Sequence, residues 1–158
     1  MRLYRICPEQ FLENYSGLGA SYQDGGRWNS KGHLVLYFAL SPSTAMLEMA
    51  NYLPSPRLVP DDYRLGIYEL PDTVAISDLP AEQLPNNWAV YPYPTSTQKI
   101  GDEWLSNGNA FALRVPSTAV PCGLEKIAVI NPIHPDCKKI HLSELVTELY
   151  NLRSFSGI

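Results

Sequence analysis

The amino-acid sequence predicts an α+β fold, with one domain over residues 1–158 and a central mixed or antiparallel β-sheet flanked by helices. Segments with strand character outnumber those with helical character, and the two kinds do not alternate regularly along the chain. Apolar residues make up 45% of the sequence and charged residues 18%, which argues against disorder and against a coiled coil. The sequence has no internal repeat that would divide it into smaller units.

The N-terminal part predicts a short strand followed by a long loop. Leu3, Tyr4 and Ile6 give the strand its apolar and aromatic character. Four glycines between positions 17 and 26 then mark a loop in which the backbone can approach a ligand closely. We expect this loop to end at Arg27.

The next segment predicts a central strand and a helix. The run from Leu34 to Leu40 has no polar alternation, as expected of a strand that is covered on both faces. Ser41 followed by Pro42 is a helix-start signal, because the serine oxygen can cap free amides and proline suits the first helical position. The helix is predicted over residues 42–53, with Glu48 at the edge of its apolar face.

The rest of the chain predicts short elements bounded by proline, glycine, asparagine or aspartate. Strands are expected at residues 65–70, 73–76, 110–115, 127–130 and 139–142, and helices at Ser96 to Ser106 and Ser143 to Arg153. The glycine fingerprint of a Rossmann dinucleotide fold is absent from the sequence.

Charge and composition exclude several functional classes. The formal charge of −4 disfavours sequence-independent binding of nucleic acid, which depends on a basic surface. The run from Leu34 to Leu40 is too short to span a membrane, and no basic segment followed by an apolar run opens the chain. The 3 cysteines form no close pair and fit no four-ligand zinc pattern. We therefore expect a cytoplasmic, metal-free protein.

Two charged side chains are the first candidates for chemistry. Arg27 follows two glycines, which let a phosphate approach a guanidinium that can bind it through two hydrogen bonds, although a surface role is the simpler interpretation. Lys31 lies four residues later and has the same two interpretations. Glu48 is costly at the border of an apolar face unless it is paired or used, or unless it reaches solvent.

Three further residues could line a pocket or simply stabilise the fold. Tyr37 could stack on a base or pack in the core. Ser117 could hydrogen-bond a ligand or stabilise a turn, and no nucleophile-elbow pattern surrounds it. Asn131 begins a rigid Asn-Pro corner, for which a well-made turn is the alternative.

Five segments together resemble the RES domain, a bacterial toxin family named for an arginine, a glutamate and a serine. These segments are RLYRIC, GGRWNSKG, VLYFALSPSTAMLEM, FALRVPSTAVP and INPIHPD, and they occur in the family's order over nearly the whole chain. By this resemblance the name-giving residues are Arg27, Glu48 and Ser117. Tyr37 and Asn131 match further positions that the family associates with its pocket.

The resemblance implies a fold related to ADP-ribosyltransferase toxins and an enzyme that cleaves the nicotinamide–ribose bond of NAD. NAD would be the substrate, no bound cofactor is implied, and the implied partner is an Xre-type DNA-binding antitoxin. Two positions depart from the family pattern: Tyr52 stands where a histidine often follows the glutamate, and Ile127 stands where an asparagine is expected. These departures bear on loop geometry, on antitoxin contacts and on the choice of acceptor.

The residue types suit this reaction. Nicotinamide leaves as a neutral molecule, and Glu48 could stabilise the oxocarbenium character that develops on the ribose. Arg27 would hold the pyrophosphate, Tyr37 would form the pocket wall, and Ser117 and Asn131 would orient the substrate through hydrogen bonds. Lys31 is included as a substrate-binding candidate.

Several functions stay open at this point. The acceptor could be water, inorganic phosphate or a protein side chain, and in the last case the protein is an ADP-ribosyltransferase with a specific target. An RNA-cleaving toxin and a non-catalytic partner-binding module are further alternatives. Self-association of the chain is also left open.

Overall fold

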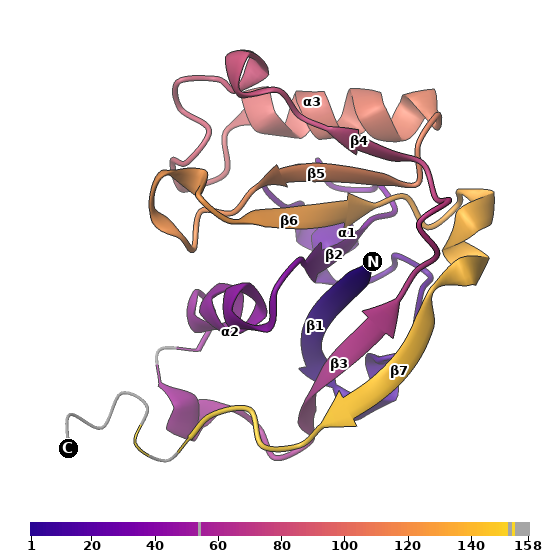
Figure 1. Cartoon of the computed structure of the whole chain (residues 1–158). Helices are drawn as coiled ribbons and strands as arrows, with labels where there is room; N and C mark the ends of the chain where they lie inside the picture. Colours follow the sequence, from indigo (N-terminus) through magenta and orange to yellow (C-terminus); the bar gives the residue numbers. More distant parts are fainter. Residues whose placement is uncertain (54, 152, 154–158) are drawn as a thin grey trace.

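A single seven-stranded sheet forms the centre of the computed structural model, which describes residues 1–53, 55–151 and 153 (Figure 1). The strand order is β4-β5-β6-β2-β1-β3-β7. The strands are β1 (Arg2–Pro8), β2 (Leu36–Ala39), β3 (Tyr63–Glu69), β4 (Ile76–Asp78), β5 (Ala112–Pro116), β6 (Lys126–Ile130) and β7 (His141–Val146). Strands β4 and β5 run parallel and all other neighbours run antiparallel, so the predicted mixed sheet is confirmed.

The sheet is open between β1 and β2. All of β1 pairs with β3, from Arg2 opposite Glu69 to Pro8 opposite Tyr63. The register of β1 with β2, in contrast, consists of the pair Tyr4–Ala39. The two halves of the sheet therefore separate on either side of this pair, at the sheet's centre.

The predicted central strand is confirmed, because β2 occupies the fourth of the seven positions. Its side chains are buried on both faces, as the unbroken apolar run implies. Phe38 packs edge-to-face against Tyr68, with ring centroids 5.0 Å apart, in the core cluster that also holds Leu3. Ala39 packs instead with Ala45 of the following helix.

Among the residues described, three α-helices accompany the sheet: α1 (Ala20–Asp24), α2 (Pro42–Ala50) and α3 (Thr95–Asn107). Figure 1 shows α3 along the side of the sheet formed by β4 and β5, whereas α2 packs against β1 and β2. The described part of the chain also forms five 3-10 turns: η1 (Glu9–Phe11), η2 (Pro56–Leu58), η3 (Ala81–Gln83), η4 (Pro121–Gly123) and η5 (Pro135–Lys139). Within the described residues, no helix is both long enough and apolar enough to cross a membrane.

The predicted start of α2 is confirmed and its predicted end is three residues late. Ser41 Oγ accepts a hydrogen bond of 3.2 Å from the Thr44 amide, and Pro42 takes the first turn. The helix ends at Ala50, although the amides of Tyr52 and Leu53 still bond to the Met49 carbonyl in a closing turn. The apolar periodicity of the sequence therefore continued past the last helical residue.

Helix α3 matches the helix predicted over residues 96–106. It buries Thr97, Gly101 and Leu105 on one face, and Gly108 ends it in a left-handed conformation, with φ of 63°. The loop predicted before Arg27 is also present, but it contains the short helix α1, which the glycine pattern did not reveal.

The predicted C-terminal helix at 143–153 is wrong. Residues up to Val146 belong to β7, which pairs with the edge of β3, and Ser143 Oγ donates a hydrogen bond of 3.0 Å to the Ile67 carbonyl. None of the described residues after Val146 is helical, and position 152 lies outside the described residues. The open edge of β3 supplies hydrogen-bond partners to the backbone of this segment, which therefore forms a strand instead of a helix.

Two other predicted strands are displaced. Of residues 73–76 only Ile76 belongs to β4, because the Val74 amide bonds back to the Pro71 carbonyl in a turn. Of residues 139–142, Lys139 ends η5, and the strand begins at His141.

Candidate active site

A cavity of about 380 Å³ lies where β1 and β2 separate. Its walls come from β1, α1, the Gly25–Trp28 loop, β2 and α2, and from residues near the C-terminal end of β5. This volume falls within the usual range for small-molecule sites. The predicted residues Arg27, Tyr37 and Glu48 all line it.

Ser117 holds Glu48 at the cavity wall. Ser117 is fully buried just after β5, and its Oγ donates a hydrogen bond of 2.6 Å to Glu48 Oε1. The same Oγ accepts a hydrogen bond of 3.1 Å from the Ala119 amide, so its proton is directed at the carboxylate. The other carboxylate oxygen accepts a hydrogen bond of 3.2 Å from Asn51. Glu48 is thus fixed in place while remaining part of the cavity lining.

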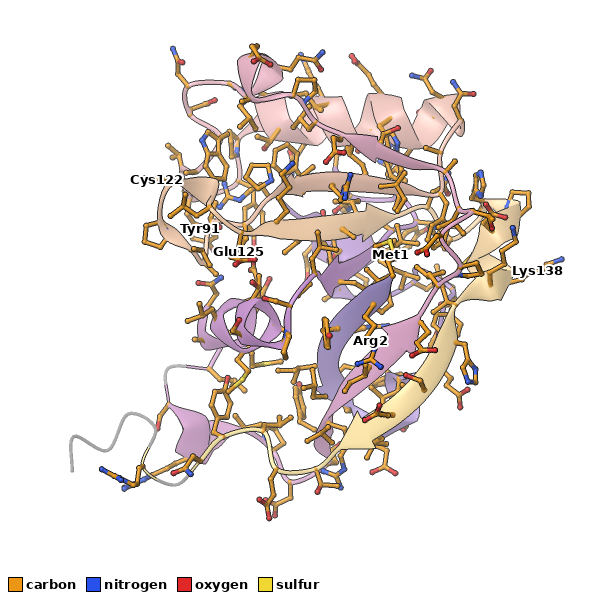
Figure 2. The ribbon with its side chains drawn as sticks, viewed as in Figure 1. Met1, Arg2, Tyr91, Cys122, Glu125 and Lys138 are labelled. Atoms are coloured by element: carbon orange, nitrogen blue, oxygen red, sulfur yellow. The ribbon has the colours of Figure 1, made fainter. Side chains whose placement is uncertain are left out.

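The ends of β5 and β6 fix the position of Ser117. The Ser117 amide donates a hydrogen bond of 2.9 Å to the Glu125 carbonyl, one residue before β6 begins. Figure 2 shows Glu125 close to this end of β5 and β6, on the side of the molecule where Tyr91 and Cys122 also lie. Ser117 does not itself line the cavity and acts on it through its hydrogen bond to Glu48.

Arg27 is held by the loop that precedes α3. Its Nη1 donates hydrogen bonds of 2.5 Å to the Trp88 carbonyl and 2.9 Å to the Val90 carbonyl. Its guanidinium carbon lies 5.2 Å from the centre of the Tyr93 ring, within the range of a cation–π contact. Burial lowers the pKa of Arg27, while Tyr93 and Glu48 act in the opposite direction. An arginine keeps its charge under these conditions, so the cavity contains a fixed cation.

Tyr37 forms part of the wall and also supports the loop that carries Arg27. Its hydroxyl donates a hydrogen bond of 2.7 Å to Asn29 Oδ1 and accepts one of 3.2 Å from the Trp28 amide. Burial raises the pKa of Tyr37, so the phenol stays neutral and keeps its proton for Asn29. The ring, and not the hydroxyl, is the part of Tyr37 available to a ligand.

Asn131 and Lys31 do not line this cavity. Asn131 lies beside His33 and Leu34 in a separate hollow of about 230 Å³. Its Oδ1 accepts a hydrogen bond of 3.2 Å from the Ile133 amide, which is the turn-stabilising role that the Asn-Pro corner also suggested. Lys31 is exposed. The structure therefore places these two residues apart from Arg27, Glu48 and Tyr37.

Both positions that depart from the family pattern belong to the cavity. Tyr52 and Ile127 contribute to its lining, so the departures change the shape of the wall. The sequence reasoning missed Arg5 and Tyr93. Arg5 lies within the opening RLYRIC segment, which could have indicated it, and its guanidinium carbon is 5.8 Å from the centre of the Phe38 ring. Tyr93 lies in a proline-rich loop that gave no signal.

No metal-binding cluster is present among the residues that the structure describes. No three histidine, cysteine or acidic side chains in this part of the chain lie close enough together to hold an ion. The charged groups of the cavity are instead two guanidinium groups and two carboxylates, from Arg5, Arg27, Asp24 and Glu48. This set can bind an anion at one point and stabilise a developing cation at another.

Comparison with known proteins identifies the family. The family model of the RES domain matches residues 2–150. The chain belongs to the RES domain family. This result confirms the resemblance that the five sequence segments indicated.

Curated relatives of this RES domain are named as toxins. "Toxin Res" of Yersinia enterocolitica serotype O:8 / biotype 1B is 38% identical over 135 residues, covering 85% of this chain and 86% of the relative. "Toxin Res" of Photorhabdus laumondii is 34% identical over 140 residues, covering 88% and 86%. The "Prs ADP-ribosylating toxin" of Sphingobium sp. is 36% identical over 143 residues, covering 89% and 86%.

A solved structure has the same fold. A chain of the M. tuberculosis MbcT–MbcA toxin–antitoxin complex superposes on this RES domain with a TM-score of 0.72, covering 92% of this chain and 82% of that one, at 21% identity. The predicted α+β architecture is confirmed by this likeness and by the sheet itself.

Proposed function

We propose that this RES domain protein is the toxin of a toxin–antitoxin pair and that it acts by cleaving the nicotinamide–ribose bond of NAD. The observation that carries the proposal is the presence of the fixed carboxylate of Glu48 and the fixed guanidinium of Arg27 in one cavity. The names of its relatives support the toxin role.

Glu48 is assigned the role of stabilising the ribose carbon from which nicotinamide departs. When neutral nicotinamide departs, positive charge develops on the ribose, and a carboxylate nearby lowers the energy of that transition state. The hydrogen bond from Ser117 keeps the carboxylate in one orientation before substrate arrives. Such preorganisation avoids the cost of reorienting the group during the reaction.

Arg27 is assigned to the pyrophosphate. Both N–H bonds of Nη1 are used by the carbonyls of Trp88 and Val90. The described part of the chain offers no hydrogen-bond partner to Nη2 or Nε, the two nitrogens that form one side of the guanidinium fork. That side matches two phosphate oxygens, so Arg27 can bind a diphosphate while remaining anchored to the protein.

The acceptor of the ADP-ribosyl group determines which enzyme this is. Water or inorganic phosphate would make it an NAD glycohydrolase or phosphorylase. A protein side chain would make it an ADP-ribosyltransferase, and the name of the Sphingobium relative, at 36% identity, favours keeping this second candidate. Both candidates begin with the same bond cleavage at the same two residues.

The proposed partner is an antitoxin of the Xre type. The structural neighbour comes from a toxin–antitoxin complex, which supports an antitoxin as the class of partner. The Xre type, a cytoplasmic location and self-association of the chain stay predictions.

The test in cells measures NAD and transcripts after induction of the wild-type chain, Arg27→Ala and Glu48→Ala. We expect NAD to fall with the wild type and to persist with both variants at equal protein levels. Mass spectrometry of the same cells would reveal a modified protein if a side chain is the acceptor. Cut transcripts with intact NAD would overturn the proposal in favour of an RNA-cleaving toxin, and unchanged toxicity of Glu48→Ala would favour a non-catalytic binding module.

A further inference from the structure

One face of α3 contacts the loop that carries Arg27 at three points. Gln98, Gly101 and Asp102 are spaced three and four residues apart and therefore lie on the same side of the helix. None of the three lines the cavity. Their contacts with the loop consist of two sets of hydrogen bonds and a direct approach of the two backbones.

The first contact fixes the residue before Arg27. Gln98 Nε2 donates a hydrogen bond of 3.0 Å to the carbonyl oxygen of Gly26. The Gly26 amide in turn bonds at 2.9 Å to the Asn29 carbonyl, which closes the loop on itself. Arg27 therefore sits within a small closed turn that is attached to α3.

The second contact fixes the residue after Arg27. A methyl group added at Gly101 would lie 1.7 Å from the carbonyl oxygen of Trp28, so only glycine lets the helix come this close. Trp28 itself is fully buried. The helix backbone thus packs directly on the loop backbone one residue beyond Arg27.

The third contact is made by the carboxylate of Asp102. Its Oδ1 accepts a hydrogen bond of 2.9 Å from the Ser30 amide, and its Oδ2 accepts one of 2.6 Å from Ser30 Oγ. The Asp102 side chain is 20% exposed, and hydrogen bonds to a charged acceptor are stronger than neutral ones. His33 Nδ1 lies 3.0 Å from Ser30 Oγ and completes the cluster.

This serine, histidine and aspartate do not form a nucleophilic triad. In a triad the serine donates its proton to histidine, and the aspartate bonds to the other ring nitrogen. Here Ser30 donates directly to Asp102, and His33 presents Nδ1 to both partners. The cluster therefore serves to hold the loop.

We infer that Gln98 and Asp102 are positioning residues for the bond cleavage. They hold the loop that carries Arg27 against α3, in the position from which Arg27 binds the diphosphate. The inference rests on the proposed function of Arg27. The Tyr93 ring, which packs against the guanidinium, lies two residues before α3 begins, so the helix and its leading loop set both the backbone and the side chain of Arg27.

A positioning role changes substrate affinity more than the rate of the chemical step. The diphosphate lies away from the bond that breaks, so a misplaced Arg27 weakens binding of the ground state and the transition state alike. We expect Asp102→Ala and Gln98→Ala to raise the KM for NAD about fivefold or more while kcat changes less than about twofold.

A conservative variant and a matched control sharpen the test. In Asp102→Asn the amide oxygen can still accept from the Ser30 amide, and the amide nitrogen can donate to Ser30 Oγ, so we expect a rise in KM of less than about twofold. Glu103→Ala removes an exposed carboxylate from the neighbouring position of α3 and should leave both constants unchanged. If Asp102→Ala does not fold, Gln98→Ala carries the same comparison.

The deciding experiment combines steady-state NAD cleavage with amide hydrogen exchange of residues 26–33 in all of these proteins. The inference predicts the rise in KM together with faster exchange in Asp102→Ala and Gln98→Ala than in Glu103→Ala. Unchanged KM in both alanine variants, a loss confined to kcat, or exchange equal to that of the control overturns it. If the wild type does not cleave NAD at all, the proposed function fails, and the exchange rates alone then report whether α3 holds the loop.

Discussion

Ser117 donates its hydroxyl proton to Glu48 across 69 positions of sequence, in a hydrogen bond of 2.6 Å. The Ala119 amide donates to the same oxygen, so the direction of the serine proton is determined. Two of the three name-giving residues of the family thus act as one unit, in which the serine supports and the glutamate faces the cavity.

Ser117→Ala should reduce NAD cleavage without abolishing it. The variant removes the donor that orients Glu48 but leaves the carboxylate in the cavity, so kcat should fall roughly 10- to 100-fold. Loss of both hydrogen bonds at Ser117 Oγ, to Glu48 and from the Ala119 amide, should also lower the free energy of unfolding by about 2 kcal/mol. Steady-state kinetics and urea denaturation measure the two effects. A complete loss of activity in folded Ser117→Ala would indicate that the serine takes part in the chemistry directly.

Arg27→Lys should weaken substrate binding even though it keeps the positive charge. Lysine lacks the planar fork and cannot hold the Trp88 and Val90 carbonyls while also binding two phosphate oxygens. We expect the KM for NAD to rise about tenfold and the affinity for ADP-ribose, measured by calorimetry, to fall in parallel. Wild-type affinity in the lysine variant would show that charge alone is sufficient.

Gly101→Ala should destabilise the fold strongly because the helix and loop backbones touch there. The added methyl group would lie 1.7 Å from the Trp28 carbonyl, and relieving that overlap should cost about 3 kcal/mol of unfolding free energy. Gly108→Ala is the matched control. Its methyl group meets no atom within 4 Å, and the left-handed φ of 63° should cost only about 1 kcal/mol. Equal losses in urea denaturation of the two variants would contradict the close approach.

Stability should fall at alkaline pH because buried tyrosines resist ionisation. Burial raises the pKa of Tyr15 to about 12, and it raises the pKa of Tyr68 as well. A group whose folded pKa is raised stabilises the fold below its unfolded pKa, near 10, and that stability is lost as pH rises towards the folded pKa. The urea midpoint should therefore decrease between about pH 10 and 12. Tyr68→Phe, which also loses the hydrogen bond to the Leu12 carbonyl, should be less stable at pH 8 but show a smaller decrease.

Local signals in the sequence predicted the elements that local physics controls. The Ser41–Pro42 pair located the start of α2, and the unbroken run around Phe38 located the central strand. The helix predicted for the C-terminal segment is wrong because the spacing of its apolar residues suits a helix as well as a strand. Only pairing with the open edge of β3 selects the strand. That edge is a tertiary feature that no local pattern contains.

The candidate site was predicted in part, for a similar reason. Arg27, Glu48 and Tyr37 do converge on one cavity, as the family resemblance implied. Asn131 matched the family pattern equally well but is used by its own turn. Tyr93 reaches Arg27 only through the path of the loop before α3, which carries no sequence signature. Contacts that depend on the path of a loop cannot be predicted from local sequence patterns.

Release of nicotinamide from NAD by the purified protein decides whether this cavity cleaves the nicotinamide–ribose bond. Glu48→Gln is the matched variant, and water, phosphate and candidate protein acceptors are supplied in turn. Nicotinamide should be released by the wild type, and at least about 100-fold more slowly by Glu48→Gln, whose neutral amide stabilises a developing positive charge far less than a carboxylate does. Intact NAD after prolonged incubation of folded wild-type protein with every acceptor would contradict this expectation, as would equal release by Glu48→Gln.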